Sequence, residues 1–459
     1  MKHICLAAAV TAALQICLSA CSGEQGRTEL PVGVFDSGTG GLTVLERILT
    51  LDAFDNDSGE MVPDGHPDFE DESFEYLADQ ANMPYGVYDA QGKSDYLRRL
   101  VRDNASFLLG DRYFLSASED RPGGVKKPCK IIVIACNTAT AYGLEDVRGM
   151  LEDRGDGTRV IGVINAGVKA ALDAMQGRTG AYAIGVMATP GTISSGAYER
   201  TILNEAGKRG LGATVSVVNQ SGYGFAEAVD SDPDFVNPGL TSPRAAYRGP
   251  RIGTGDADIK PDLLDVYDFD PKGLLWHSGA ALKTGIQLNS AANYARFNLV
   301  SLAERHRLSG NPAPIGAIIL GCTHYPFELE TLKECVAGLR EFRKGDSYPY
   351  RDIFSEDLIF IDPAVYTAIE CYQALREDGL LNTVSGSRMA NAYISVPAAS
   401  LDKSFLTGEG LLTFEYKYGR MSGDADTGTR IVPFSDDNID AHNRARIKAM
   451  LPECGQLLL

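Results

Sequence analysis

The sequence has little that would tie it to nucleic acid, to zinc or to a membrane span. Its formal net charge is −18 over 459 residues, and no basic patch is available to neutralise phosphates. No two of its nine cysteines have the CxxC spacing of a zinc site. Six cysteines beyond residue 21 are also too few for a disulfide-rich scaffold of this length. Apart from the extreme N-terminus, no hydrophobic stretch is long enough to span a bilayer.

The N-terminus predicts export. A single lysine precedes an apolar run and small residues, so residues 1–20 are expected to be a signal peptide rather than a fold element. The Leu-Ser-Ala-Cys sequence at 18–21 resembles a bacterial lipobox, which implies a lipid on Cys21 and a tether over 21–30. The protein is then expected to be a membrane-anchored lipoprotein on the periplasmic or outer-membrane face. The alternative is a plain signal peptide cut near Ala20, with an ordinary thiol after it.

The rest of the chain alternates short apolar runs with amphipathic segments. This pattern of strand, turn and helix predicts a parallel α/β fold. In such folds the functional residues gather at the carboxyl ends of the strands. The short sequences DSG, CNT, TPGT and GCTHYP all fall at predicted strand ends. They are therefore the candidates for chemistry.

Two of these turns carry a cysteine followed by residues that form hydrogen bonds. The first spans Cys136, Asn137 and Thr138, and the second spans residues 322–324, which read Cys-Thr-His. A buried cysteine on its own is usually a small hydrophobic residue. The repetition of the arrangement at equivalent turns favours a chemical role for both thiols.

Six stretches of the sequence resemble the glutamate racemase family of cofactor-independent amino-acid racemases. They are VGVFDSGTGGLTVL, MPYG, KSDYL, IACNTATA, GVMATPGTISSGAY and LGCTHYP, and they follow the family's order between Val32 and Ala374. The resemblance implies two similar parallel-sheet α/β domains with the active site between them. It also implies interconversion of L- and D-glutamate, without a cofactor, for cell-wall peptidoglycan.

The resemblance and the composition shifts together predict a domain plan with two insertions and a C-terminal extension that is expected to be rich in strands. The expected parts are domain A at 31–157 plus 325–400 with an insertion at about 52–73, domain B at 158–324 with an insertion at about 231–311, and the extension at 401–459.

The chemistry of racemisation explains why two thiols would be needed. The proton on Cα must leave from one face, and a proton must return to the other, so two bases on opposite faces need not move. A thiol suits this task because its reference pKa lies little above neutral. The resemblance makes Cys136 and Cys322 the opposed acid/bases, with Asp36 assisting the first and His324 the second.

The acid that supports His324 is less certain from the sequence. Family members have a cysteine-proline turn followed by a glutamate, and here the turn reads Gly222-Tyr223 with Asp230 at the position of the acid. Glu227 lies about one helical turn earlier and is the alternative. The prediction adopts Asp230.

Several site residues also have plain structural readings. Asp36 could cap a helix, His324 could be a core histidine, and Tyr85 could serve only in packing. The family pattern instead assigns a set of residues to binding the substrate's carboxylates and amino group: Ser37, Tyr85, Gly86, Asn137, Thr138, Thr323, Thr189 and Thr192.

The expected ligand is a small amino acid, glutamate or aspartate, with no cofactor, no metal and no nucleic acid, and a homodimer stays open. Two other functions compete with a glutamate racemase. One is a racemase of the same family for aspartate or another amino acid, and the other is a ligand-binding lipoprotein that has lost catalysis. A binding protein needs a polar cleft but no paired cysteines, so the retention of both turns favours an enzyme.

Overall fold

The computed structural model describes residues 26–155, 157–276, 285–424, 427–439 and 441–459. The predicted signal peptide, Cys21 and the first part of the tether lie outside these ranges. The chain forms two compact units, of which unit 1 comprises Met1–Val163 with Thr367–Leu459 and unit 2 comprises Ile164–Tyr366. None of the described helices combines the length and the apolar character needed to cross a bilayer.

Unit 1 is built on a six-stranded sheet in the order β14-β13-β2-β1-β5-β6. All neighbours run parallel except β14, which pairs antiparallel with β13. Every residue of the central strand β1 is buried, as expected for a strand covered on both faces. The strands are β1 Val32–Asp36, β2 Ser73–Ala78, β5 Ile131–Ile134, β6 Arg159–Gly162, β13 Met389–Pro397 and β14 Thr429–Pro433, with a separate hairpin of β3 Arg112–Tyr113 and β4 Gly124–Val125.

Helices follow the strands of unit 1, as the amphipathic pattern predicts. The longest, α5, begins after Cys136 and ends where Gly155 takes a left-handed conformation with φ of 68°. Its neighbour α4 buries residues at helical spacing, among them Leu97, Leu100, Val101 and Leu108. The helices are α2 Leu42–Leu49, α3 Gly86–Ala90, α4 Ser94–Leu109, α5 Asn137–Arg154, α13 Pro363–Glu377, α14 Phe414–Gly419, α15 Ala441–Met450 and α16 Pro452–Leu458, with 3-10 turns η1 Thr39–Gly41, η2 Gln80–Asn82 and η7 Lys403–Phe405.

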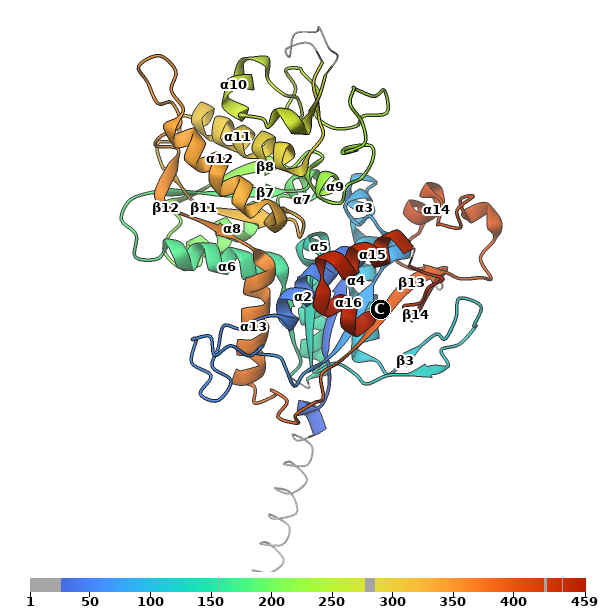
Figure 1. Cartoon of the computed structure of the whole chain (residues 1–459). Helices are drawn as coiled ribbons and strands as arrows, with labels where there is room; N and C mark the ends of the chain where they lie inside the picture. Colours follow the sequence, from blue (N-terminus) through green and yellow to red (C-terminus); the bar gives the residue numbers. More distant parts are fainter. Residues whose placement is uncertain (1–25, 156, 277–284, 425–426, 440) are drawn as a thin grey trace, which may run out of the picture. The chain divides into compact units, whose positions relative to one another are not determined.

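Unit 2 is built on a four-stranded parallel sheet in the order β12-β11-β7-β8. Helices α11 and α12 lie side by side in this unit (Figure 1). Both units therefore confirm the predicted parallel α/β class. The elements are β7 Tyr182–Ala188, β8 Val215–Ser221, β9 Leu274–Leu275, β10 Gln287–Leu288, β11 Ile315–Gly321, β12 Phe354–Ile361, α6 Val163–Met175, α7 Pro190–Ser194, α8 Ala197–Lys208, α9 Phe225–Val229, α10 Leu264–Tyr267, α11 Ala291–Ser309, α12 Leu329–Glu341, η3 Pro261–Leu263, η4 Pro271–Gly273 and η6 Tyr325–Glu328.

Two expectations about the C-terminal half are wrong. Residues 325–366 were expected in domain A, but they belong to unit 2 because β12 pairs with β11, with Ile318 opposite Phe360. The extension at 401–459 was expected to be rich in strands, yet its described residues form one strand, β14, three α-helices and the 3-10 turn η7. Its aromatic segment FEYKYG forms α14, which Thr413 caps by accepting a hydrogen bond from the backbone of Tyr416.

The two predicted insertions are also more integrated than surface loops. Helix α11, inside the range 231–311, is part of the core of unit 2 and buries ten residues, including Phe297 and Leu299. The segment 52–73 contains no helix or strand before β2, but it buries Phe54 and Phe69. Phe54 stacks on Tyr372 with ring centroids 4.4 Å apart. Burial of large apolar side chains makes both segments part of the fold.

A buried ion pair lies at the amino ends of β2 and β5 in the sheet of unit 1. Lys130, just before β5, donates to Glu72 over 2.6 Å, and the two side chains are 0% and 2% exposed. The ammonium also donates to the backbone carbonyls of Thr28 and Leu380 at 2.6 Å and 2.8 Å. Burial raises the pKa of Glu72 and lowers the pKa of Lys130, so the attraction has to offset a desolvation cost on both groups.

Removing one partner of this pair should destabilise the fold strongly. Lys130→Met is expected to lower the free energy of unfolding by about 3–5 kcal/mol, because the Glu72 carboxylate is left buried without a counter-charge. The matched control is Lys208→Met, which breaks an exposed pair with Glu205 and should cost less than about 1 kcal/mol. Urea unfolding of both variants measures the difference, and equal effects would contradict the burial argument.

Candidate active site

The predicted site residues of unit 1 lie at the carboxyl ends of neighbouring strands. Strands β1 and β5 pair in parallel, with Phe35 opposite Ile134, so Asp36 and Cys136 emerge at the same edge of the sheet. The Asp36 carboxylate accepts hydrogen bonds from the backbone of Gly41 at 2.8 Å and of Gly38 at 3.3 Å. A side chain at position 41 would start only 2.4 Å from the Asp36 Cβ atom, so this turn requires glycine.

Cys136 is the N-cap residue of α5 and is 7% exposed. Its Sγ atom accepts from the backbone of Ala139 at 3.4 Å, and its thiol donates to Ser37 Oγ at 3.5 Å. Burial, reinforced by the negative charge of Asp36, raises the pKa of Cys136 to about 12. Without a ligand this side chain is therefore a thiol.

The pKa of Asp36 is also raised by burial, against the lowering effect of the backbone N–H groups that it accepts from. Its charge disfavours a thiolate at Cys136 and does not activate one. Any assistance from Asp36 must come from accepting the thiol proton, because a buried carboxylate with a raised pKa is a better proton acceptor.

The remaining predicted residues of unit 1 lie at the start of α5 and of α3. Asn137 and Thr138 begin α5 directly after Cys136 and are half-buried, and Gly86 begins α3. The hydroxyl of Tyr85 turns inward, where it donates to Asp79 and accepts from Asn104 Nδ2. The side chain of Tyr85 is 1% exposed, so the contribution of this residue to a substrate site is limited to its backbone.

Unit 2 presents a second cluster at the ends of β7 and β11, which also pair in parallel. Cys322 follows β11 and is 7% exposed. The Nδ1 atom of His324 lies 3.5 Å from Cys322 Sγ and 3.4 Å from Thr323 Oγ1. Its Nε2 atom lies 3.1 Å from Asp230 Oδ1. The structure thus brings together the thiol, the imidazole and the acid that the sequence singled out.

The charge state of His324 follows from these contacts. Burial alone would lower its pKa, but negative charge on Cys322 and the hydrogen bond to Asp230 outweigh it and raise the pKa to about 10. At neutral pH both ring nitrogens then carry protons, one facing Cys322 and one facing Asp230.

The geometry selects Asp230 over Glu227 as the partner of His324. Asp230 ends α9 and faces the imidazole, whereas Glu227 is exposed on that helix. Gly222 stands where the family has its turn cysteine, and a side chain there would begin less than 2 Å from the hydroxyl of Tyr325. That hydroxyl occupies the place of a side chain at 222, so the position requires glycine in this chain.

Thr189 and Thr192 lie at the end of β7. Thr189 caps α7 by accepting from the backbone of Thr192 at 3.3 Å, and the two hydroxyls are 3.0 Å apart. Thr192 is 4% exposed, while Thr189 is half-buried. Thr189 is therefore the member of this pair that is open to a ligand.

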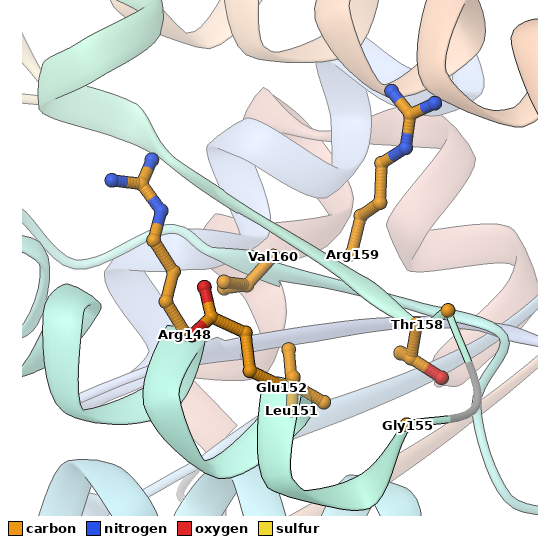
Figure 2. A pocket seen from close by; sticks show the side chains of 8 residues that line it. Arg148, Leu151, Glu152, Gly155, Thr158, Arg159 and Val160 are labelled. Carbon is orange, nitrogen blue, oxygen red and sulfur yellow. The ribbon is translucent and has the colours of Figure 1, made fainter.

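A cavity of about 450 Å³ lies elsewhere in unit 1 and contains none of the predicted residues. Figure 2 shows that its walls come from the end of α5, with Arg148 and Glu152, and from Arg159 and Val160 of β6. At about 1.5 Å per helical residue, Glu152 is roughly 20 Å along α5 from Cys136. This cavity faces the opposite end of the sheet from the thiol.

Sequence reasoning missed the polar residues behind Tyr85. Asp79, Asn82 and Asn104 are each at most 4% exposed and form a hydrogen-bonded group with the tyrosine hydroxyl. The run DQAN directly after β2 was a signal, because buried polar residues at a strand end rarely serve packing alone. Among the described residues, no group of three or more His, Cys, Asp or Glu is placed to hold a metal ion, and the six cysteines there are free.

Comparisons with known proteins point to one family. A glutamate racemase of Corynebacterium diphtheriae is 35% identical over 214 residues, which are 47% of this chain and 58% of the relative. One of Aquifex pyrophilus is 34% identical over 38% of this chain and 50% of its own length, and one of Thermus thermophilus is 26% identical over 80% and 89%. The chain thus spans little more than half the length of the first curated relatives that it matches.

Solved structures were compared as well. A glutamate racemase isoform of Bacillus anthracis aligns with a TM-score of 0.46 and 22% identity, over 80% of this chain and 88% of the other. A glutamate racemase of Francisella tularensis in complex with D-glutamate aligns with a TM-score of 0.45 and 22% identity over the same shares. No family model matches the sequence. The curated relatives that the chain matches are thus glutamate racemases, and the chain is similar to them in sequence.

Proposed function

We propose that this chain is a cofactor-independent isomerase that interconverts L- and D-glutamate by two-base proton transfer at Cα. One observation carries the proposal: each unit ends a buried parallel strand in a nearly buried cysteine beside an ionisable neighbour, Asp36 in unit 1 and His324 in unit 2. The relatives that share these motifs are named glutamate racemases.

The two clusters are suited to opposite roles in one turnover. Cys136 holds its proton, with a pKa of about 12, so it starts as the acid. Cys322 lies 3.5 Å from His324 Nδ1, and in this proposal it takes the part of the base. The Cα–H bond breaks as Cys322 takes the proton, and the Cys136 S–H bond breaks as its proton forms the new Cα–H bond on the other face. The reverse direction exchanges the roles.

The neighbours stabilise the charges that this exchange creates. After a turnover in this direction Cys136 is a thiolate. Asp36 accepts the proton of Cys136 only when the site is prepared for the reverse direction, in which Cys136 starts as the base. The substrate's ammonium group, held near Cys136, lowers the thiol's pKa by its opposite charge. Carboxylates of the substrate are held by hydroxyl, amide and backbone donors of Ser37, Asn137, Thr189 and Thr323 and by the other predicted binding residues, Gly86, Thr138 and Thr192.

Location is the second part of the proposal. Lipid on Cys21 places the enzyme at the membrane, on the periplasmic or outer-membrane face, where the accessible glutamate would come from outside or from wall turnover. The homodimer stays a prediction.

Purified protein without its first 20 residues should racemise either enantiomer of glutamate without an added cofactor. In D2O the reaction should place deuterium on Cα, because both protons pass through exchangeable thiols. Chiral chromatography and mass spectrometry measure the two events over a panel that includes aspartate. Turnover of aspartate alone would assign the alternative substrate, and binding without exchange on any amino acid would favour a ligand-binding lipoprotein.

The cysteine variants test the assignment of roles. Cys136→Ser and Cys322→Ser should each lower kcat by at least about 1000-fold, because a serine hydroxyl is far too weak an acid for either role. Cys335→Ser, a buried cysteine of α12 outside both clusters, is the control and should keep its activity. Near-normal racemisation by either active-site variant would refute the two-thiol mechanism.

The pair of His324 and Asp230 predicts a pH dependence of stability. The folded pKa of His324, about 10, exceeds its ordinary value of 6.5, so its stabilisation is complete below about pH 6.5 and is lost as the pH rises through 10. Asp230→Asn should weaken the pH dependence of the free energy of unfolding in this window, and Glu227→Gln should not. Urea unfolding at several pH values measures this dependence. Identical curves of unfolding free energy against pH for wild type and Asp230→Asn would contradict the pairing.

Membrane anchoring has its own test. In cells of a bacterium that processes lipoproteins, the full chain should fractionate with membranes and incorporate labelled palmitate, and Cys21→Ala should do neither. Palmitate-free soluble wild-type protein would rule out the lipid anchor and leave the racemase proposal untouched.

A further inference from the structure

Helix α14 of the C-terminal extension contacts the loop that carries two predicted substrate-binding residues. This loop comprises residues 82–86, and both segments belong to unit 1. Lys417 Nζ donates to the carbonyl of Met83 at 2.5 Å, and the hydroxyl of Tyr418 donates to the carbonyl of Pro84 at 3.3 Å. Two backbone oxygens that precede Tyr85 are therefore held by side chains more than 300 residues away.

Arg420 makes the third contact. It is 5% exposed, lies over the ring of Tyr96 at 4.8 Å, and donates to Asn82 Oδ1 at 2.6 Å and to the hydroxyl of Tyr88 at 3.2 Å. The guanidinium also donates to the carbonyl of Thr427 at 2.6 Å. The planar guanidinium of a buried arginine has few alternative orientations once several of its N–H groups are hydrogen-bonded. It therefore holds the groups that accept from it in fixed positions.

This contact orders a chain of hydrogen bonds that ends at Tyr85. Because Asn82 Oδ1 faces Arg420, its Nδ2 group must face Asp79, to which it donates at 2.8 Å. The other oxygen of Asp79 accepts from the hydroxyl of Tyr85, and Asn104 donates to that hydroxyl at 2.8 Å. Tyr85 and Cys136 share one buried core. The series of hydrogen bonds that begins at Arg420 thus ends at Tyr85, a residue of the core that also contains Cys136.

A cavity borders Asn82, the first residue of the loop. Asp79, Asn82 and Asn104 line a cavity of about 270 Å³ between α4 and the strands β13 and β14. A cavity leaves its lining without packing partners, so hydrogen bonds have to hold the lining groups in place. Of the three contacts from the extension, the one from Arg420 reaches this lining, at Asn82 Oδ1.

We propose that Lys417, Tyr418 and Arg420 form a clamp that positions loop 82–86, and with it Gly86 and the backbone of Tyr85, for binding of the amino-acid substrate. The clamp residues are positioning residues, since they act through the loop. This inference rests on the proposed function but adds a role for the C-terminal extension that the racemase motifs do not contain. It makes substrate affinity depend on residues outside those motifs.

Kinetics of Arg420→Gln test the clamp. KM for glutamate should rise by about 5-fold or more with kcat changed by less than about 2-fold, because a disordered loop weakens binding before it affects proton transfer. The control is Glu415→Gln, an exposed residue of the same helix, which should match wild type. A loss confined to kcat, or unchanged kinetics in an active enzyme, would overturn the clamp.

A second readout does not require activity. In Arg420→Gln, backbone amides of residues 79–90 should exchange with deuterium faster than in wild type and in Glu415→Gln, as followed by mass spectrometry. If Arg420→Gln does not fold, Lys417→Met and Tyr418→Phe replace it, each removing one hydrogen bond to the loop. Unchanged exchange in all variants refutes the clamp, whereas inactive wild-type protein with faster exchange in the variants refutes only the racemase proposal.

Discussion

A thiol that is buried at a strand end cannot ionise without help, and this constraint governs both clusters. Desolvation penalises the charged form, as the pKa of about 12 for Cys136 shows. Each cysteine therefore needs a partner that shares its proton or balances its charge. The parallel sheets supply those partners, because the carboxyl ends of adjacent strands lie on one edge.

The ionisable neighbours of the two cysteines carry charges of opposite sign, so the two clusters are not equivalent. Asp36 is an acid beside a thiol, and its charge keeps the proton on Cys136. Negative charge on Cys322 and the hydrogen bond to Asp230 raise the pKa of His324 to about 10, so the neighbour of Cys322 is positively charged. A racemase needs one acid and one base at the start of each turnover, and two identical clusters would have to break their symmetry first. Here the neighbours already differ.

The sequence predicted the parts of the fold that depend on local pattern. The strands before Asp36, Cys136 and Cys322 could be predicted from apolar runs that end in glycine or polar residues, and Asp230 could be placed by its spacing from Gly222. The assignment of residues 325–366 to unit 2 could not be predicted, because hydrophobic periodicity does not show which strand β12 pairs with. Helix α14 was missed because its aromatic residues have strand propensity, and Thr413 overrides it by capping.

The central claim is that two different groups handle the two protons on Cα. Racemisation of a single enantiomer in D2O, followed by circular dichroism, tests it directly. With two bases the product carries deuterium while the remaining substrate carries protium, so the slower return reaction should drive the signal past zero before it decays. A monotonic approach to zero, with protium retained in the first product formed, would show that one group carries the proton across and would contradict the account.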